Sequence, residues 1–183
     1  MPEIINSTYI SLDGVVENPH EWPSIERASD GRGDEIQTEL LASCDAVLMG
    51  RRTYESFAPA WQARSGDPLS DRMNAIAKYV VSSTLSDPVW QNTTVISGDV
   101  AGRIRKLKEQ PGQDIVQYGF GSVTTLLIEH RLLDELRLWI HPLFVGRGAT
   151  DDLLFPKGPP TQFELADSTI LKSGTAILTY RLA

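Results

Sequence analysis

The run Val47-Leu48-Met49-Gly50-Arg51-Arg52-Thr53-Tyr54-Glu55-Ser56 is the part of the chain around which the rest is organised. Four residues suited to a buried strand lead into Gly50, and two arginines, a hydroxyl and a helix-compatible tail follow, so we predict a strand, a tight turn and a helix start. The first N–H groups of a helix have no partner within it, and arginine offers a planar charged fork to phosphate oxygens. The run therefore predicts an anion site, although on this pattern alone the arginines could equally face water.

Length and composition limit the class of protein. The 183 residues, of which 41% are hydrophobic, suit a single domain over 1–183 with one core. A formal charge of -7 and a sequence pI near 4.9 argue against a general nucleic-acid partner, because such proteins neutralise phosphates with a basic surface. No stretch approaches the roughly 20 apolar residues of a membrane span, and the N-terminus lacks a signal-like pattern. We therefore expect a soluble, cytoplasmic protein without a membrane partner.

Metal and disulfide chemistry find little support in the sequence. The single cysteine, Cys44, excludes an intrachain disulfide and a multi-cysteine metal site. The three histidines, His20, His130 and His141, lack metal-ligand spacing. No metal is expected, and a metal hydrolase is a poor candidate.

A first strand and a long irregular segment precede the Gly50 turn. Residues 3–11 mix apolar and β-favouring types and end at Ser11-Leu12-Asp13-Gly14, where Asp-Gly readily ends regular structure. The segment from there to Gly33, which contains Trp22, is long for a loop in a compact domain. It is either an active-site flap or a flexible surface excursion.

A helix is expected between this segment and the Gly50 turn. It runs from Asp34 to Cys44, and its buried stripe consists of Ile36, Leu40, Leu41 and Cys44. Asp34 and Gln37 make a plausible capping pair at its start, which is a structural role that needs no chemistry. Asp34 also points along the edge of the apolar stripe, so a functional role is the alternative.

Strands and helices continue to alternate after the Gly50 turn. We expect a short helix, a loop marked by Pro59, Gly66 and Pro68, a helix over 70–76, strands over 78–81 and 93–96, and a helix over 100–109. Trp61 in the loop could cover a ligand or only the core. Ser82-Ser83-Thr84 follows the strand over 78–81, and hydroxyls at a strand's carboxyl end lie where open α/β sheets bind ligands, although ordinary turn residues are more common.

A second glycine turn, Gly119-Phe120-Gly121-Ser122, follows a buried strand that begins at Asp114. We expect Ser122 to cap a helix whose inner face is Val123, Leu126, Leu127 and His130. The turn is not the dinucleotide fingerprint of the doubly wound fold, because the third glycine is missing. Two strand-to-helix turns suited to phosphate, with a hydroxyl-rich strand end, nevertheless favour a dinucleotide ligand.

The C-terminal third predicts more strands. Residues 134–145 alternate apolar and polar types, and residues 163–171 and 175–182 suit a β-hairpin. The whole pattern predicts an α/β protein with a central mixed, mostly parallel sheet, helices on both faces and a C-terminal antiparallel hairpin.

An ordered set of short motifs resembles the dihydrofolate reductase superfamily. The motifs are Ser11-x-Asp13-Gly14, Met49-Gly50-Arg51-Arg52-Thr53-Tyr54-Glu55, Gly119-x-Gly121-Ser122, Leu133-Asp134-Glu135-Leu136, Pro142, Gly146-x-Gly148 and Leu154-Phe155. They are most similar to the branch that contains the reductase domain of bacterial riboflavin biosynthesis, the RibD C-terminal-like branch. The resemblance covers essentially the whole chain and implies a dihydrofolate reductase-like three-layer fold.

The resemblance also implies NADPH as the cofactor and assigns residues to it. The counterparts of Gly50, Arg51, Arg52 and Thr53 hold cofactor phosphates in that family, those of Ser82 and Ser83 lie near the ribose phosphate, and the turn Gly119, Gly121, Ser122 and Val123 holds the pyrophosphate. The loop at Asp13 and Gly14 resembles the segment that closes over nicotinamide and substrate, and with Trp22 and Gln117 it is assigned to substrate binding. Asp34, sixteen residues before Gly50, resembles the acid that engages the pterin in true dihydrofolate reductases.

Two departures from the family pattern affect the substrate. True dihydrofolate reductases have a Gly-Gly pair where this chain has Gly119-Phe120-Gly121, and riboflavin-pathway reductases tend to have a glutamate where this chain has Gln117. We expect an NADPH-dependent reductase acting on a C=N or C=O group of a small pterin- or ribosylaminopyrimidine-like molecule, with Asp34 as the group that polarises or protonates it. Dihydrofolate reductase proper and a non-catalytic NADPH sensor are the alternatives. Riboflavin-type relatives are often dimers, which implies a homodimer.

Overall fold

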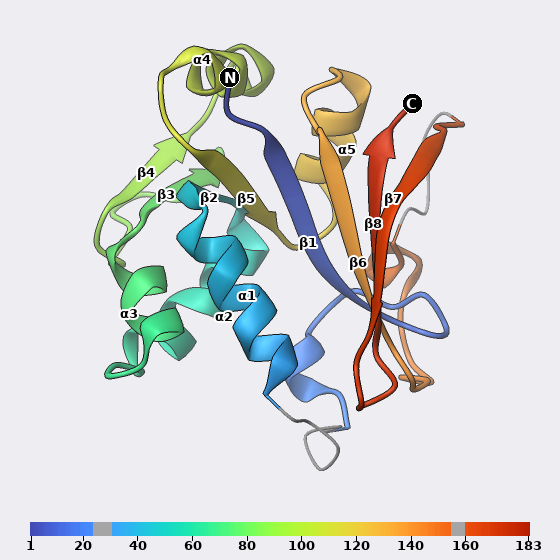
Figure 1. The fold of residues 1–183 in the computed structure, drawn as a ribbon. Helices are drawn as coiled ribbons and strands as arrows, with labels where there is room; N and C mark the ends of the chain where they lie inside the picture. Colours follow the sequence, from blue (N-terminus) through green and yellow to red (C-terminus); the bar gives the residue numbers. More distant parts are fainter. Residues whose placement is uncertain (24–30, 155–159) are drawn as a thin grey trace.

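One mixed sheet of eight strands runs through the computed structural model, which describes residues 1–23, 31–154 and 160–183 (Figure 1). The strand order is β4-β3-β2-β5-β1-β6-β8-β7. The strands are β1 (Ile4–Ser11), β2 (Cys44–Gly50), β3 (Ala77–Val81), β4 (Thr93–Ile96), β5 (Asp114–Tyr118), β6 (Glu135–His141), β7 (Phe163–Ile170) and β8 (Ala176–Leu182). Strands β1 to β6 pair parallel with one another, whereas β8 pairs antiparallel with both β6 and β7.

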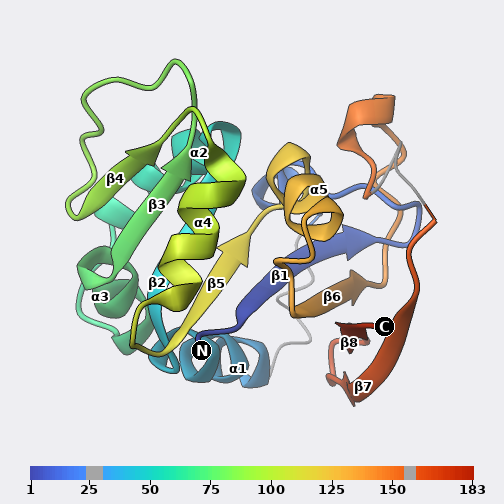
Figure 2. The same cartoon turned by 90° about the horizontal axis from the view of Figure 1, so that it is seen from above.

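Helices cover both faces of this sheet and form the two outer layers (Figures 1 and 2). One face carries α1 (Arg32–Ala42), α2 (Arg51–Gln62) and α3 (Pro68–Ala75), and the other carries α4 (Val100–Glu109) and α5 (Ser122–Glu129). Short 3-10 helices, η1 (Pro19–Glu21) and η3 (Thr150–Asp152), lie in the connections. The predicted three-layer α/β architecture with its C-terminal antiparallel hairpin is therefore confirmed.

The central strands are apolar on consecutive positions because both of their faces are buried. Ile4 and Leu48 point into the core beneath α4 and α5, whereas their neighbours Ile5 and Met49 point into the core beneath α1, α2 and α3. Two separate hydrophobic cores thus hold the helical layers to one sheet.

Parallel pairing brings the carboxyl ends of β1, β2, β3 and β5 to the same edge of the sheet. Strands β2 and β5 are direct neighbours, and Met49 pairs with Tyr118 at their ends. Gly50, the last residue of β2, and Gly119, the residue after β5, therefore lie side by side at this edge. This edge is where open α/β sheets place their ligand sites.

The start of α1 differs from the prediction. The helix begins at Arg32 after Gly31, a residue in the left-handed conformation at φ 80°, so the expected Asp34–Gln37 capping pair is wrong. Asp34 lies exposed in the first turn, while the Gln37 side chain is buried. Cys44, expected at the end of this helix, is the first residue of β2 and is buried there.

The helix after the Gly50 turn is longer than predicted. It passes through Pro59 to Gln62, so the loop expected at Pro59 is wrong. A proline inside a helix removes one backbone hydrogen bond, and burial of Tyr54 and Ala58 on one face of α2 offsets that loss. The next helix begins at Pro68, where the Asp67 carboxylate accepts a hydrogen bond of 2.9 Å from the Ser70 N–H.

The helix after the second glycine turn also differs in its details. Gly121 occupies the N-cap position and Ser122 is the first helical residue, so the predicted serine cap is wrong. The residues buried along α5 are Val123, Thr124, Leu127 and Ile128. His130, predicted on the inner face, follows the helix end and is exposed, because the buried stripe lies one position away from the expected one.

In the ranges that the structure describes, no helix is both long enough and apolar enough to cross a membrane.

Candidate cofactor and substrate site

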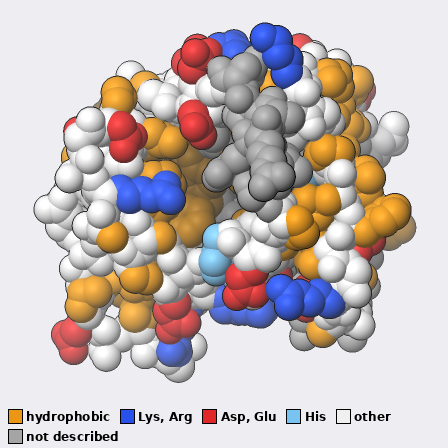
Figure 3. All heavy atoms as spheres, turned by 90° about the horizontal axis from the view of Figure 1, so that it is seen from below, with side chains coloured by type: hydrophobic (Ala, Val, Ile, Leu, Met, Phe, Trp, Pro, Cys, Tyr) orange, Lys and Arg blue, Asp and Glu red, His pale blue; other side chains and the backbone are white. Residues whose placement is uncertain are grey.

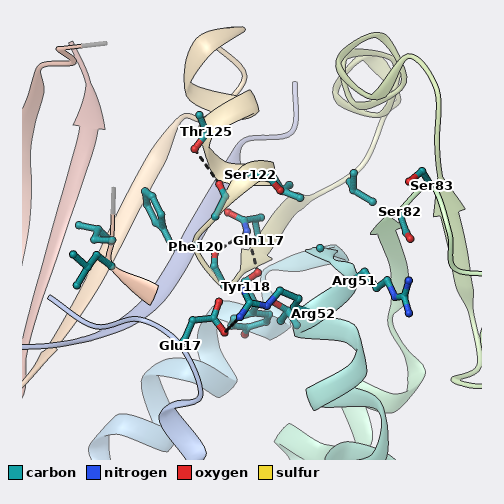
Figure 4. Close-up of a pocket in the computed structure, with 18 of the residues that line it drawn as sticks. Glu17, Arg51, Arg52, Ser82, Ser83, Gln117, Tyr118, Phe120, Ser122 and Thr125 are labelled. Carbon is teal, nitrogen blue, oxygen red and sulfur yellow. Dashed lines mark hydrogen bonds and ion pairs between the residues drawn. The ribbon is translucent and has the colours of Figure 1, made fainter. Parts of the chain in front are cut away.

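A cavity of about 530 Å³ opens at the carboxyl ends of β2, β3 and β5 (Figure 4). All the residues predicted to bind the cofactor line it, together with Gln117: Gly50, Arg51, Arg52, Thr53, Ser82, Ser83, Gly119, Gly121, Ser122 and Val123. Glu17, from the loop after β1, and Leu153 and Leu154 close its other side. Segments far apart in the sequence thus form one cavity.

The two glycine turns touch each other within this cavity. Gly119 has φ +80°, and a Cβ added to it would collide with the hydroxyl oxygen of Thr53. A Cβ added to Gly50 would lie 3.4 Å from the Val123 side chain. The two turns that the sequence suggests for one dinucleotide ligand therefore lie side by side. Gly119 is joined to Phe120 by a trans peptide.

Both helices that follow these turns leave their first N–H groups open. Helix α2 has Gly50 and α5 has Gly121 at the N-cap, and neither helix has a side-chain cap. A Cβ built on Gly121 would meet nothing within 4 Å, so the backbone there is open to an approaching group. Two uncapped helix N-termini facing one cavity are a suitable cradle for an anion such as a pyrophosphate.

Arg51 lies at the β3 end of the cavity, near Ser82 and Ser83 (Figure 4). Its Nε donates to Glu55 at 2.6 Å, and its guanidinium also donates to the Thr84 hydroxyl. The Ser82 hydroxyl accepts from the N–H groups that follow it, at 3.2 and 2.9 Å, and so fixes the turn after β3. This end of the cavity combines a held guanidinium with exposed hydroxyls.

Arg52 lies toward the opposite end and has different partners. Its guanidinium is 3.6 Å from the Glu17 carboxylate and 4.0 Å from that of Asp152 (Figure 4). It therefore joins the start of α2 to the loop after β1 and to η3. Arg51 and Arg52 are adjacent in the sequence, but their side chains lie in different electrostatic surroundings.

A small inner pocket of about 80 Å³ adjoins the main cavity at Tyr118 and Gly119. Its lining residues come from β1, α1, α2, β5 and the loop after β1, and they are Ser7, Thr8, Tyr9, Val16, Gln37, Phe57, Tyr118 and Gly119. None of these residues is formally charged at neutral pH. Five of its eight lining residues are buried.

An outer groove of about 790 Å³ lies between α1 and the α2–α3 connection. Its lining residues are Asp34, Glu35, Thr38, Glu39, Trp61, Arg64, Asp67, Pro68, Leu69 and Ser70. The Phe57 ring, which lines the inner pocket, lies 6.2 Å from the Trp61 ring in the groove and 5.6 Å from the Tyr118 ring. Figure 3 shows a hollow with hydrophobic side chains at its floor and acidic and basic side chains around it on the face of the molecule seen from below.

Asp34, the predicted catalytic acid, lies in the outer groove and does not line the main cavity. The α1 side chain that reaches the inner pocket is Gln37, one turn later. Gln37 is 8% exposed, and its amide oxygen accepts from the Tyr118 hydroxyl at 3.3 Å. The catalytic role of Asp34 remains a prediction.

Gln117 lines the main cavity, but its side-chain amide is fully bonded within the protein. Its oxygen accepts from Asn6 at 2.5 Å and Thr124 at 3.1 Å, and its nitrogen donates to the carbonyls of Tyr118 and Gly119 at 2.9 and 2.8 Å. An amide has two donor and two acceptor positions, and all are used. Gln117 therefore shapes the second glycine turn, and a substrate contact through its amide requires breaking one of these bonds.

Asp13 and Gly14 shape the loop after β1. The Asp13 carboxylate accepts from the Ser11 hydroxyl at 2.5 Å and from the N–H groups of Gly146 and Val145 at 2.9 and 3.1 Å. These bonds, that of Ser11 first, lower the pKa of Asp13 to about 2. The Gly14 carbonyl accepts from Leu154, so both residues tie the loop to the chain after β6. The loop in turn carries Glu17 into the cavity.

Trp22 packs in the same region, beside a hollow of about 210 Å³. Its Nε1 donates to the Glu17 carbonyl at 3.0 Å, and its ring meets the edge of His141 at 5.7 Å. His141 also contacts Tyr9 at 4.7 Å between ring centroids, and burial lowers the pKa of His141 to about 4. Residues 24–30 of the expected flap lie outside the described residues.

Local sequence pattern does not identify the aromatic and amide side chains that line the inner pocket. Tyr9 lies two residues after Ser7 on β1, so strand alternation could have placed both on one face. Phe57 was hidden by the wrong helix end at Pro59. In the described ranges, no group of three or more His, Cys, Asp or Glu residues could hold a metal ion.

The sheet order, the two helical layers and the antiparallel hairpin define a dihydrofolate reductase-like α/β protein. Within that class the chain belongs to the RibD C-terminal domain family, whose model matches residues 2–178.

Individual relatives agree with this assignment. The chain is 29% identical over 153 residues to the protein named "Uncharacterized protein YyaP" of Bacillus subtilis (strain 168), covering 79% of this chain and 77% of that protein. A putative riboflavin biosynthesis protein from Shewanella sp. PV-4 superposes with a TM-score of 0.72 at 18% identity, covering 100% of this chain and 99% of that one. The diaminohydroxyphosphoribosylaminopyrimidine deaminase/5-amino-6-(5-phosphoribosylamino)uracil reductase of Thermotoga maritima gives a TM-score of 0.68 at 16% identity, with 100% of this chain and 57% of that one covered. The two solved structures share the fold.

Proposed function

We propose that the protein is an NADPH-dependent reductase that delivers a hydride to a C=O or C=N group of a small heterocyclic substrate. The observation that carries this proposal is the pair of uncapped helix N-termini, at Gly50 and Gly121, that face one cavity leading to an inner pocket. Family membership supports it, since the Thermotoga maritima relative is named as a reductase.

In this proposal the cofactor lies along the length of the main cavity. The N–H groups at the starts of α2 and α5 would hold the pyrophosphate, with Gly119 and Gly121 allowing its close approach. Arg51, with Ser83 and Thr84 beside it, would hold the ribose phosphate that distinguishes NADPH from NADH. Bound in this way, the reduced nicotinamide supplies the hydride.

The chain's own residues position the substrate and control water. The inner pocket would hold the reacting group next to Tyr118 and Gly119, which it shares with the main cavity. Asp13, Gly14 and Trp22 would hold the loop that borders this junction, and Asp34 would act on the substrate from the outer groove, directly or through water.

The proposal is tested by titrating NADPH and NADH against the wild type, Arg51→Ala and Arg105→Ala. Losing one charge-assisted phosphate contact removes about 1.5–3 kcal/mol, so Arg51→Ala should weaken NADPH roughly 10- to 150-fold and change NADH little. Arg105 is exposed on α4, away from the cavity, and its variant should bind both cofactors like the wild type. Equal losses for both cofactors would contradict the assignment of Arg51.

Turnover separates a reductase from a sensor. A reductase oxidises NADPH steadily when a suitable acceptor is added, whereas a sensor binds NADPH and leaves it reduced. Binding without oxidation across a panel of heterocyclic imines and carbonyls would favour the sensor.

A further inference from the structure

We propose that the inner pocket and the outer groove together form a cleft that takes an uncharged, planar carbonyl compound, and that Tyr9 donates the proton that the carbonyl oxygen needs. This inference rests on the proposed reductase function and names its substrate class. It is carried by the hydrogen-bond polarity of the inner pocket and by the charge of the outer groove.

The hydrogen bonds around the inner pocket leave hydrogen-bond donors facing its interior. The Trp139 indole and the Gln37 amide both donate to the Ser7 hydroxyl oxygen, at 3.1 and 3.4 Å, so the Ser7 hydrogen is left to donate. Tyr118 donates to the Gln37 oxygen, which turns the amide nitrogen of Gln37 toward Ser7, and the Gln37 side chain also interacts with the Tyr9 hydroxyl. Ser7 is 4% exposed and Gln37 is 8% exposed, so this arrangement is built into the core. An acceptor such as a carbonyl oxygen fits it.

Tyr9 is the donor best placed to give up a proton. It lines the inner pocket, and Trp139 and His141 hold its ring at centroid distances of 5.5 and 4.7 Å. The Tyr9 hydroxyl is close enough to the Gln37 side chain for a hydrogen bond, whereas the hydroxyl of Tyr118 donates to the Gln37 oxygen. Burial raises the pKa of Tyr9 more than this hydrogen bond lowers it, so the hydroxyl keeps its proton at neutral pH until charge develops next to it.

The inner pocket and the outer groove share no lining residue, but one aromatic pair connects them. Phe57 and Trp61 are in ring contact across their boundary, and the Asp34 carboxylate in the groove is near enough to Tyr9 to contribute to the rise in its pKa. In the proposed complex, the ligand places its reacting end in the inner pocket and the rest of its ring system along Trp61.

The charge of this cleft opposes an anionic substrate. The described groove residues include four carboxylates, on Asp34, Glu35, Glu39 and Asp67, against one cation, Arg64, whose guanidinium lies 5.4 Å over the Trp61 ring. Arg32 pairs with Glu35 and Glu39 at 3.0 and 3.4 Å and neutralises part of that charge. The inner lining adds no cation. A phosphate or sulfonate on the ligand would be repelled by these carboxylates, whereas an uncharged ring would not be repelled.

The chemical step balances with one hydride and one proton. The carbonyl carbon accepts the hydride, the C=O π bond breaks, and its electron pair moves to oxygen. That oxygen takes the hydroxyl proton of Tyr9, and the phenolate recovers a proton from water. One carbonyl, one hydride and one proton give one alcohol.

The test uses isatin, a neutral planar heterocyclic ketone, and isatin-5-sulfonate, which has the same ring system with one negative charge. Binding of each compound is measured by tryptophan fluorescence on the NADP⁺-saturated protein and on the protein alone, and NADPH oxidation is followed with each. Isatin should bind at least 10-fold more tightly than the sulfonate, and Asp34→Asn should narrow that ratio several-fold.

Variants of two tyrosines test the proton donor. Tyr9→Phe should lower isatin turnover by at least 100-fold while weakening isatin binding less than 10-fold, because a positioned acid acts mainly in the transition state. Tyr180→Phe, on β8 and packed against the opposite core, should match the wild type. Unchanged turnover in Tyr9→Phe would overturn its role.

The comparison of isatin with isatin-5-sulfonate uses the wild-type protein, so it does not depend on whether any variant folds. Equal binding of the two compounds, or failure of isatin to bind or react while NADPH binds, would overturn the substrate class and leave the cofactor proposal standing. Failure of NADPH itself to bind would overturn the proposed function and this inference with it.

Discussion

Replacing Gly119 by alanine tests whether contact between the two glycine turns builds the site. Gly119 has φ +80°, and an added Cβ would collide with the hydroxyl oxygen of Thr53 at the start of α2. The left-handed backbone alone costs an ordinary residue roughly 1–2 kcal/mol. Crowding in a packed site adds about 1–3 kcal/mol. The turn must also shift away from α2, so we expect NADPH affinity to fall by at least 10-fold.

Gly66→Ala is the matched control, because Gly66 has φ +89° and nothing lies within 4 Å of an added Cβ. Gly66→Ala should lower the free energy of unfolding by the cost of the left-handed backbone alone, roughly 1–2 kcal/mol, and should bind NADPH as tightly as the wild type does. Urea unfolding followed by tryptophan fluorescence gives the free energies of unfolding, and NADPH fluorescence gives the affinities. Adding Thr53→Ala to Gly119→Ala removes the hydroxyl that the new Cβ would meet, so it should restore the free energy of unfolding lost to crowding and leave the backbone cost unchanged. If Gly119→Ala and Gly66→Ala are alike in both measurements, contact between the turns does not matter and the reasoning is refuted.

Three further predictions follow from single side chains. Gln117→Glu places a carboxylate against the carbonyls of Tyr118 and Gly119, and it should lower the free energy of unfolding by roughly 1–3 kcal/mol in urea; an unchanged midpoint would count against the bonded amide. Burial lowers the pKa of His141 from 6.5 to about 4, so the unfolded chain binds the proton more tightly than the folded protein does. The free energy of unfolding should therefore fall as the pH drops from about 6.5 to 4. The loss should be at most about 3 kcal/mol at 1.36 kcal/mol per pKa unit, and smaller because the ring is partly exposed. His141→Phe should lack that part of the pH slope, and an identical slope would contradict the burial of the neutral ring. Asp34→Asn should change stability by less than about 1 kcal/mol, since the residue is exposed in the first turn of α1, and slow turnover; unchanged turnover would remove Asp34 from the chemistry.

The fold was predictable because the strong signals are local. Val47-Leu48-Met49-Gly50 is apolar on consecutive positions and ends at a glycine, which is the signature of a strand buried on both faces and followed by a turn. The turn after Tyr118 repeats this pattern. Because both strands are parallel, their turns had to reach the same edge of the sheet, and the cofactor candidates were found together for that reason.

The inner pocket was not predictable from local pattern. Its polarity depends on which strands are neighbours: β1 lies beside β6 with Tyr9 opposite Trp139, and only that register brings Ser7, Gln37 and the Trp139 indole together. The position of Gln37 depends on where α1 begins, and Gly31 in the left-handed conformation starts the helix two residues before Asp34. Because α1 begins at Arg32 and not at Asp34, Gln37 lies on the buried side of the helix and is not part of a cap.

A crystal structure of the protein soaked with NADP⁺ tests the central claim most directly. We predict that the pyrophosphate lies between the first N–H groups of α2 and α5, with the ribose phosphate on Arg51 and the nicotinamide at Gly119 beside the inner pocket. A nucleotide bound elsewhere on the molecule, or bound here with its ribose phosphate away from Arg51 and its nicotinamide away from the inner pocket, would contradict the account.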